Sequence, residues 1–304
     1  MKPLITIFTP TYNRAYTLPV CYESLKRQTC KEFIWLIIDD GSTDNTRQLV
    51  QSWIKEGSIK IVYHYQENQG MHGAHNKAYE LIDTELNVCI DSDDYMPDDA
   101  VEKITCFWLK NGSETYAGMV GLDATFNGEI IGTKLPEKLE ASTHSDLYRK
   151  YKVKGDKKLV YRTALTKRTS PYPIYEGEKY CPLAFKYILI DQFGPLLILN
   201  DILCHVEYLK DGSSRNIITQ YKTNPKGFLL YRVTTMNYAQ SFKERFRASI
   251  HFISSNLLLK NYKYWMSSPN KLITILATPL GVALFLFIKK TKRVTFMEVN
   301  KTNS

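Results

Sequence analysis

The first hundred residues alternate between short apolar runs and longer stretches in which apolar residues recur with helical spacing. The helical stretches cover residues 18–28 and 42–57, and the second begins with Ser, Thr and Asp and ends at a glycine, as helices commonly do. The apolar runs, rich in β-branched residues, fill positions 4–9, 33–39, 59–65 and 86–91. This order of strand and helix predicts right-handed βαβ units and a parallel sheet. Because the runs are apolar on both faces, we expect an α/β fold with a single Rossmann-like, mostly parallel sheet flanked by helices.

Polar clusters follow each of the four predicted strands. They are "PTYNR" at 10–14, "DDGSTD" at 39–44, "ENQGMHGAHN" at 67–76 and "DSDD" at 91–94. In parallel α/β sheets ligands bind outside the carboxyl ends of the strands, so the four clusters converge on one edge. The convergence predicts a nucleotide site.

The aspartates at 91–94 repel one another, and a bound cation would offset that cost. Asp91 and Asp93 are two residues apart at a strand end, so both carboxylates can face the same cleft. Carboxylate oxygens suit Mg²⁺ or Mn²⁺, which usually complete their shell with phosphate oxygens and water. The structural alternative is helix capping, which we assign to Asp98 and Asp99. The pair Asp91 and Asp93 therefore predicts a metal-bound nucleotide diphosphate.

Two further clusters offer contacts to a nucleotide. Asp39 and Asp40 end the second strand, where one carboxylate can accept from a base N–H or a ribose hydroxyl and the other can bond the turn. Tyr12, just beyond the first strand, offers a ring that could stack on a base. Asp44 is expected to cap the following helix.

The four clusters, in order and spacing, resemble the family 2 glycosyltransferases of the GT-A fold. The resemblance rests on "TPTYNR", "IIDDGSTDNT", "ENQGMHGAHNKA" and "IDSDD" and covers residues 4–105. Two later stretches, "PYPIYEGEKYCP" at 171–182 and "VEYLKDGSSRN" at 206–216, look like the acceptor-side half of one bacterial, surface-glycan branch.

The resemblance implies a nucleotide-sugar donor, most often a UDP-sugar, and a divalent cation, Mn²⁺ or Mg²⁺. In the family pattern Pro10 and Tyr12 flank the uracil, Asp40 contacts the base and Asp91 lies against the ribose. Asp93 is the metal ligand of the D-x-D motif, with Asp91 beside it and His205 completing the metal shell. The full donor-binding set expected on this basis is Pro10, Tyr12, Asn13, Arg14, Asp39, Asp40, Asn68, Gly70, His75, Asn76 and Asp91.

The resemblance also implies inversion of the anomeric centre by a single displacement, which needs a general base near the acceptor hydroxyl. Glu178 in "EGEKY" stands at the expected acidic position, with Glu176 as the substitute and a structural salt bridge as the alternative role of Glu178. The chain departs from the family pattern at three positions, which have His75 instead of Arg, Met71 instead of Lys, and Lys179 instead of a second acidic residue. The departures leave open which cationic side chain contacts the diphosphate and which carboxylate is the base.

The net charge of +9 is unevenly distributed along the chain. Residues 1–100 hold 9 Lys or Arg against 15 Asp or Glu, whereas residues 241–304 hold 11 against 2. The basic end contains an apolar run at 272–288, which at about 1.5 Å per residue spans about 25 Å, short of the roughly 30 Å hydrocarbon core. Pro279 and Gly281 interrupt the run. We expect an interfacial or re-entrant helix on an anionic membrane surface, with a spanning helix and a buried core helix as the alternatives.

The chain is expected to divide into a catalytic region and a basic helical extension. The catalytic region is residues 1–220, with a nucleotide-sugar-binding half at 1–110 and an acceptor half at 111–220, and the extension is residues 221–304. A hairpin and loop are expected at 125–142, a helix at 180–192, a strand at 195–209 and two helices within 226–265.

These observations predict a metal-dependent, inverting glycosyltransferase at the inner face of the cell membrane, acting on a lipid-linked or surface glycan. The chain has no Q-x-x-R-W motif and no series of long apolar segments, which disfavours a processive synthase. A nucleotidyltransferase is disfavoured because "TPTYNRAYT" has no glycine for a phosphate loop, and a nucleic-acid partner would leave the apolar run unexplained. A non-catalytic membrane or glycan-binding protein that kept the fold stays as the alternative.

Overall fold

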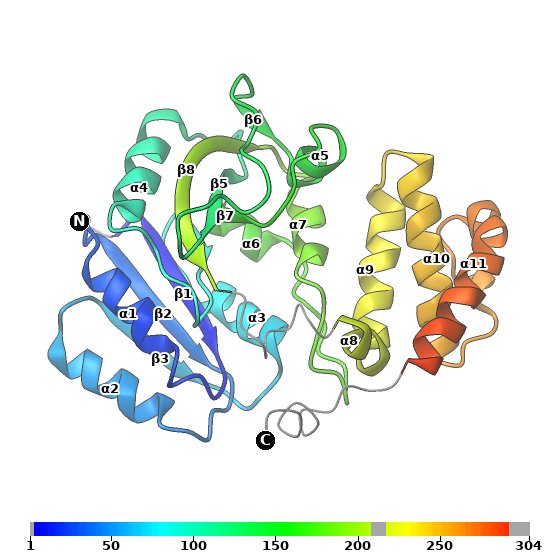
Figure 1. Ribbon diagram of the computed structural model, residues 1–304, viewed down its shortest axis with the longest axis horizontal. Coiled ribbons are helices and arrows are strands. Elements are labelled where there is room, and N and C mark those ends of the chain that lie inside the picture. Colours follow the sequence, from blue (N-terminus) through cyan, green and yellow to red (C-terminus); the bar gives the residue numbers. More distant parts are fainter. Residues whose placement is uncertain (1–2, 208–216, 292–304) are drawn as a thin grey trace. The chain divides into compact units, whose positions relative to one another are not determined.

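The computed structural model describes residues 3–207 and 217–291, and an eight-stranded sheet organises the first of these stretches (Figure 1). The order across the sheet is β3-β2-β1-β4-β7-β5-β8-β6. The strands are β1 (Ile5–Thr11), β2 (Phe33–Asp39), β3 (Ile61–Tyr65), β4 (Leu86–Cys89), β5 (Gly118–Thr125), β6 (Ala141–Ser142), β7 (Lys157–Arg162) and β8 (Leu196–Val206).

The first four strands form the parallel half of this sheet. β1 pairs in parallel with β2 and β4, and β2 pairs in parallel with β3. Beyond β4 the sheet becomes mixed, because β7 lies antiparallel between β4 and β5, β8 is parallel to β5, and β6 is antiparallel to β8. The prediction of a single, mostly parallel sheet with flanking helices is confirmed.

Helices alternate with the strands in the first half of the chain and dominate its end. Those before β8 are α1 (Leu18–Lys26), α2 (Thr46–Glu56), α3 (Met71–Leu81), α4 (Ala100–Asn111), α5 (His144–Arg149), α6 (Thr163–Arg168) and α7 (Ala184–Ile190). Those after it are α8 (Ile217–Thr223), α9 (Pro225–Tyr238), α10 (Phe242–Leu258), the 3₁₀ turn η2 (Tyr264–Met266) and α11 (Lys271–Lys290).

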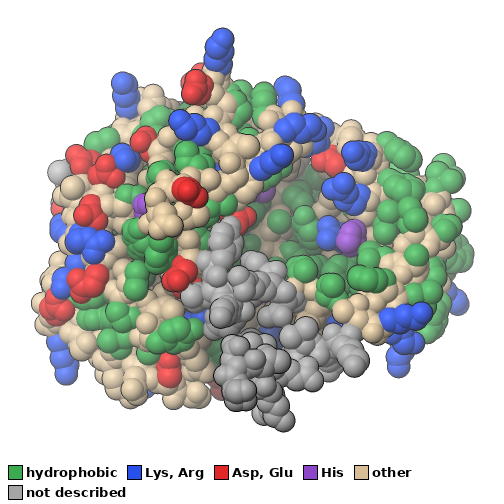
Figure 2. Space-filling model, in the orientation of Figure 1, with side chains coloured by type: hydrophobic (Ala, Val, Ile, Leu, Met, Phe, Trp, Pro, Cys, Tyr) green, Lys and Arg blue, Asp and Glu red, His purple; other side chains and the backbone are tan. Residues whose placement is uncertain are grey.

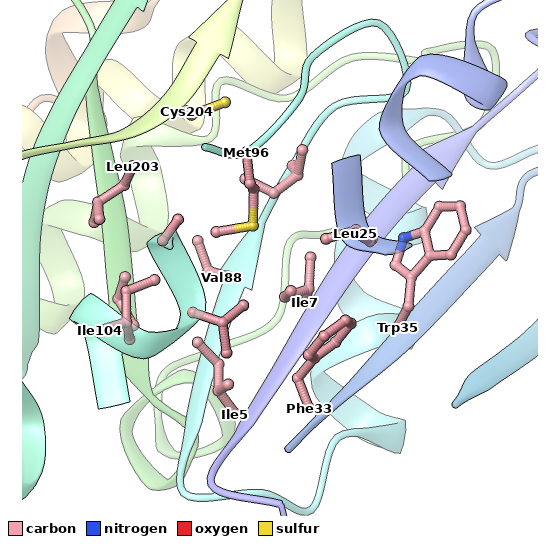
Figure 3. Packing of buried hydrophobic residues seen from close by; sticks show 14 of the residues in the cluster. Ile5, Ile7, Leu25, Phe33, Trp35, Val88, Met96, Ile104, Leu203 and Cys204 are labelled. Carbon is pink, nitrogen blue, oxygen red and sulfur yellow. The ribbon is translucent and has the colours of Figure 1, made fainter. Parts of the chain in front are cut away.

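The main core lies between one face of the parallel strands and the helices α1, α2 and α4. Alternate residues of β1 and β2, such as Ile5, Ile7 and Trp35, point into this core, together with Val88 of β4 (Figure 3). Phe8 of β1 points to the opposite face, where its ring meets Tyr79 of α3 edge-on. Both faces are therefore covered by helices, as the two-sided apolar runs predicted.

The chain divides into two compact units, with the segment 173–185 leaving the sheet unit to join the C-terminal helices. The described part of the sheet unit is residues 3–172 and 186–207, and that of the helical unit is residues 173–185 and 217–291. The helical unit has a small core of its own, made by α9, α10 and α11 around Phe252, Ile253 and Ala277.

Several expected boundaries shift by a few residues, and some elements were not expected. The third strand begins at Ile61 and the fourth ends at Cys89, while the two late helices appear as α9 and α10. The expected hairpin is a tight turn after β5, in which Thr125 N–H donates to the carbonyl of Glu129. The short elements β6, β7, α5 and α6 had no clear sequence pattern. The second acceptor-side stretch, 206–216, falls outside the described residues beyond Glu207.

Candidate active site

The loops that follow β1 and β2 are tied together by Asn13. Its backbone is left-handed, with φ of 52°, which Asn tolerates better than most residues. Its side-chain oxygen accepts the N–H groups of Thr43 (2.7 Å) and Asp44 (3.3 Å), and its own N–H donates to Oγ of Ser42 (2.9 Å). Asp44 returns the contact by accepting the N–H of Ala15 (3.0 Å). Asn13, expected to bind the donor, thus holds the two loops in register.

Asp39 closes the turn at the end of β2. One carboxylate oxygen accepts the N–H of Ser42 (2.8 Å) and the other accepts the hydroxyl of Tyr63 on β3 (2.6 Å). Asp39 is buried. Burial of Tyr63 and, to a smaller extent, its hydrogen bond to this carboxylate raise the pKa of the Tyr63 hydroxyl well above its usual value. Both carboxylate oxygens of Asp39 are thus hydrogen-bonded within the protein.

Asp40 holds the loop between β3 and α3. Its carboxylate accepts the side-chain amide of Gln66 (2.7 Å) and the N–H groups of Gln69 (2.9 Å) and Gly70 (2.8 Å), and the residue is only 3% exposed. Gly70 has φ of 83°, a conformation that favours glycine, and the chain enters α3 directly after it. The expected donor residues Asp40 and Gly70 therefore bond each other across this loop.

Of the two α3 residues expected among the donor contacts, His75 is buried and Asn76 is partly buried. His75 is 1% exposed, and its ring meets Phe8 edge-on with 5.0 Å between centroids. Burial, with smaller contributions from His72 and Lys186, lowers the pKa of His75 to about 3. A neutral imidazole lacks the charge of the arginine in the family pattern, and a donor contact by His75 stays a prediction.

Asn76 makes a two-way amide contact with the backbone of Tyr172. Its Nδ2 donates to the carbonyl of Tyr172 (2.7 Å) and its Oδ1 accepts the N–H of the same residue (2.8 Å). Because both ends of the amide are used, Asn76 anchors the chain where it leaves the sheet unit.

The aspartate loop after β4 is fixed by a short antiparallel bridge to the end of β8. Tyr95 and His205 exchange two backbone hydrogen bonds (3.1 and 2.7 Å), and their rings stack with 4.6 Å between centroids. Nδ1 of His205 lies 2.8 Å from the carbonyl of Thr125. A carbonyl only accepts, so Nδ1 carries a proton and donates this hydrogen bond. Within the loop Asp91 is exposed and Asp93 is partly exposed.

Beneath this loop lies a buried charge cluster that sequence reasoning missed. Burial raises the pKa of Asp94 to about 8, an effect that Lys158 opposes and that Asp91 and Asp93 reinforce. Asp94 accepts the N–H of Glu207 (3.3 Å), which ties the aspartate loop to the chain beyond β8. Lys158 of β7 lies 3.7 Å from Asp123 of β5, and both are largely buried. The only sequence signal was Asp94, the third aspartate of "DSDD", since β7 itself had no clear pattern.

The carboxylate oxygens at this edge suit a hard cation that binds together with a phosphate-containing ligand. Across residues 3–207 and 217–291, no three His, Cys, Asp or Glu side chains group closely enough to hold a metal ion by themselves. The expected set of Asp91, Asp93 and His205 is therefore not a preassembled cage. Two carboxylates with room for phosphate oxygens and water are what Mg²⁺ and Mn²⁺ commonly use.

The remaining expected donor residues lie at the surface of the same edge. Tyr12 is 49% exposed, and Pro10, Arg14 and Asn68 are partly exposed. Arg14 donates to the hydroxyl of Tyr16. The sheet unit thus presents an aromatic ring, a guanidinium, an amide and two carboxylates around tightly fastened loops.

Glu178 and Glu176, the expected base and its substitute, belong to the helical unit. Glu178 is buried, and its two carboxylate oxygens accept the N–H groups of Lys226 and Gly227 (2.9 Å each) in the first turn of α9. A carboxylate at a helix N-terminus satisfies donors that the helix leaves unpaired. These contacts make Glu178 an anchor of α9 and leave its role as a base a prediction. Glu176 is exposed.

Together the fold and the site define an α/β protein with a nucleotide-binding type of strand-end edge. The model of the family described as glycosyl transferase family 2 matches residues 6–160, about half of the chain. The chain belongs to this family, which confirms the resemblance read from its motifs.

Curated relatives resemble the first part of the chain. The putative teichuronic acid biosynthesis glycosyltransferase TuaG of Bacillus subtilis is 36% identical over 110 residues, which are 36% of this chain and 43% of TuaG. A PGL/p-HBAD biosynthesis glycosyltransferase of Mycobacterium tuberculosis is 29% identical over 106 residues, 34% of this chain and 41% of that protein. The matches thus span less than half the length of these relatives.

Solved structures resemble the chain over almost its whole length. TarS of S. aureus, residues 1–349 in complex with UDP, superimposes with a TM-score of 0.63 at 17% identity, covering 94% of this chain and 90% of that one. The mannosyltransferase PcManGT of Pyrobaculum calidifontis, in complex with GDP-Man and Mn²⁺, gives a TM-score of 0.57 at 16% identity, covering 95% and 83%. At these identities the similarity establishes the GT-A type of fold.

Proposed function

We propose that the protein is a metal-dependent, inverting glycosyltransferase that moves one sugar at a time from a UDP-sugar to a lipid-linked or surface glycan. The observation that supports this most is the pair Asp91 (exposed) and Asp93 (partly exposed) after β4, at the strand-end edge that also carries the exposed ring of Tyr12 after β1. The TarS structure that contains UDP-GlcNAc and the family membership support the choice of donor.

Different residues of this edge would contact different parts of the nucleotide sugar. Tyr12 stacks on the base, with Pro10 beside it, and Arg14 and Asn68 offer donors to the ribose and the phosphates. Asp91 and Asp93 would hold Mn²⁺ or Mg²⁺, which when bound neutralises charge on the departing diphosphate. Nε2 of His205, the ring nitrogen that does not bond the carbonyl of Thr125, would offer a further ligand to the same ion. Asn13, Asp39 and Asp40 act indirectly, by keeping the loops in position.

The chemical step needs a carboxylate that takes the proton of the acceptor hydroxyl as its oxygen attacks the anomeric carbon. The bond to the nucleoside diphosphate breaks on the opposite face, so the configuration inverts. Glu176 has an exposed carboxylate, whereas both oxygens of Glu178 are engaged by α9. We therefore assign the proton transfer to Glu176 and the anchoring of its segment to Glu178.

The proposed acceptor places the enzyme at the inner face of the cell membrane, on an anionic lipid surface. The basic charge of the helical unit and the apolar helix α11 support this location.

The test is nucleotide binding with a matched pair of variants. Thermal shifts would be measured with UDP-GlcNAc and GDP-mannose, with and without Mn²⁺, on the wild type, on Asp93→Ala and on Asp98→Ala. Asp98 pairs with Arg27 on the surface, so its variant controls for the loss of an aspartate. We expect metal-dependent stabilisation by one nucleotide sugar, abolished only by Asp93→Ala. If no nucleotide stabilises the wild type with metal present, the donor site does not function. That result would favour the alternative of a non-catalytic membrane or glycan-binding protein.

A further inference from the structure

One side of α11 is an uncovered apolar stripe. The exposed positions follow helical spacing along the whole helix, so they lie on a single face. Between the lysines at the two ends of the helix each of them is apolar, whereas the outer face of a surface helix in a soluble domain is normally polar. The stripe consists of Leu272, Ile275, Leu276, Pro279, Leu280, Ala283, Leu286 and Phe287.

The opposite side of α11 is packed on α10 and on the turn before α11. A Cβ added at Gly281 would lie 2.6 Å from Cβ of Ile253, so the two helix backbones approach closely there. Thr274 and Ser268 share a hydrogen bond of 2.6 Å in the buried interface. The helix is therefore half covered and fixed in place, and its stripe faces away from the helical unit's core.

Aromatic residues of the turn before α11 extend the stripe. Tyr264 of η2 points inward, where its hydroxyl donates to Oγ1 of Thr278 (3.4 Å). Its neighbours Trp265 and Met266, and Tyr262 before them, are each more than half exposed. Hydrophobic side chains also gather on the visible surface of the region formed by α10 and α11 (Figure 2). Trp and Tyr are the residues that proteins concentrate at the level of lipid headgroups.

The surroundings of the stripe are strongly basic. Between residues 217 and 291 the sequence has eleven Lys or Arg and a single acidic residue, Glu244. Exposed lysines stand at both ends of the stripe, with Lys263 and Lys271 at one end and Lys289 and Lys290 at the other. An anionic lipid surface attracts such lysines, each of which strengthens binding roughly fivefold. A second protein surface would need a matching acidic, apolar patch.

The length of α11 alone would allow it to cross a bilayer, since its 20 residues are the one described helix that is long and apolar enough. Its packing argues against a crossing. α10 lies along α11 and would enter the bilayer with it, carrying Arg245 and Arg247 in its first turns. Charged side chains at the centre of a bilayer are costly. The same helix lying in the plane of the membrane keeps these charges in water.

We infer that α11 and the turn Tyr262–Met266 form an in-plane membrane anchor, which immerses the stripe in one leaflet of an anionic bilayer without crossing it. The inference deepens the membrane location in the proposed function and shares its lipid-linked acceptor. It does not depend on the donor chemistry, so it can be tested without nucleotide.

The experiment measures binding of the full chain to sealed vesicles of phosphatidylcholine with and without phosphatidylglycerol. Trp265 reports insertion, because it is half exposed while Trp35, Trp53 and Trp108 are buried. We expect a blue shift of its emission and quenching by brominated acyl chains only in vesicles that contain phosphatidylglycerol. Protease added outside should remove a tag placed after residue 304, since an in-plane helix leaves both of its ends on one side.

A matched pair of variants identifies the lipid-facing stripe. Leu272→Glu with Leu276→Glu should weaken vesicle binding at least tenfold for each leucine. Leu109→Glu on α4 changes an equally exposed leucine (75% against 79% for Leu272) in the sheet unit and should leave binding unchanged. Each variant would first be checked for wild-type thermal stability.

Three outcomes would overturn the inference. A protected tag would show that α11 crosses the bilayer. Unchanged vesicle binding by the double variant would remove the stripe from the lipid contact. A dimer in solution that the double variant converts to a monomer, without vesicle binding by the wild type, would assign the stripe to a second copy of the chain. Loss of vesicle binding with intact nucleotide binding would leave the transferase proposal standing.

Discussion

Replacing Asp40 by alanine tests whether this aspartate fastens a loop or binds the donor directly. Its carboxylate accepts three hydrogen bonds of 2.7 to 2.9 Å from Gln66, Gln69 and Gly70, and it is almost fully buried. A hydrogen bond to a charged group contributes about 1.5–3 kcal/mol, and a buried donor left without a partner costs about 1–3 kcal/mol. Since relaxation and water recover part of the loss, we expect Asp40→Ala to lower the free energy of unfolding by about 3–6 kcal/mol.

Urea unfolding followed by tryptophan fluorescence measures this loss, because Trp35 and Trp53 stack in the core of the sheet unit. Asp98→Ala is the matched control. Its carboxylate pairs with Arg27 at the surface, where a salt bridge contributes about 0–1 kcal/mol. If Asp40→Ala unfolds within about 1 kcal/mol of the wild type and yet loses nucleotide affinity, the fastening role is wrong and Asp40 contacts the donor.

Three further predictions concern single groups. The pKa of His75, lowered from 6.5 to about 3 by burial, makes its contribution to stability complete above pH 6.5. As the pH falls from 6.5 towards 3, the free energy of unfolding decreases by about 1.4 kcal/mol per pH unit. Urea unfolding measured at a series of pH values should show this slope in the wild type and not in His75→Gln. Glu178→Gln should cost about 1–3 kcal/mol of stability by turning an amide group towards α9, whereas Glu176→Gln should keep stability and lower kcat by about 10²–10⁴; the reverse pattern would make Glu178 the base. Gly281→Val should destabilise the helical unit by about 1–3 kcal/mol, seen as a lower melting temperature, because the added side chain meets Ile253.

The parallel half of the fold could be predicted because its signals are local. Each strand there is a continuous apolar run, and each is followed by a helix with a recognisable apolar face. The hydrophobic periodicity and the order of the elements are therefore enough to predict this half. The mixed half could not be predicted in the same way. β7 reads "KKLVYR", and Lys158 within it is buried against Asp123. Only the tertiary partner makes a strand with two lysines favourable there, and no local pattern reports a partner 35 residues away.

The location of the candidate site could be predicted, but the roles of its residues could not. A polar residue at a strand end must lie at the common edge, whatever it contacts. Whether its side chain faces solvent depends on which donors the neighbouring loop supplies. Asp40 meets two backbone N–H groups of the loop before α3, whereas Asp91 remains exposed at an equivalent strand end. The backbone path of the loop decides this difference, and side-chain identity carries little information about it.

The residues that hold the loops at this edge and the carboxylates after β4 are expected to contribute to binding in different ways. Asn13, Asp39 and Asp40 fix three loops before any ligand arrives, so the entropy of ordering those loops is lost in folding and not again in binding. Asp91 is exposed and Asp93 is partly exposed, and a bound cation would offset the repulsion between their charges. Substitutions at Asn13, Asp39 or Asp40 should therefore lower stability and weaken the binding of every nucleotide equally. Substitutions at Asp91 or Asp93 should weaken only the binding that depends on metal. Comparing affinity with and without Mn²⁺ in one variant of each group separates the two contributions.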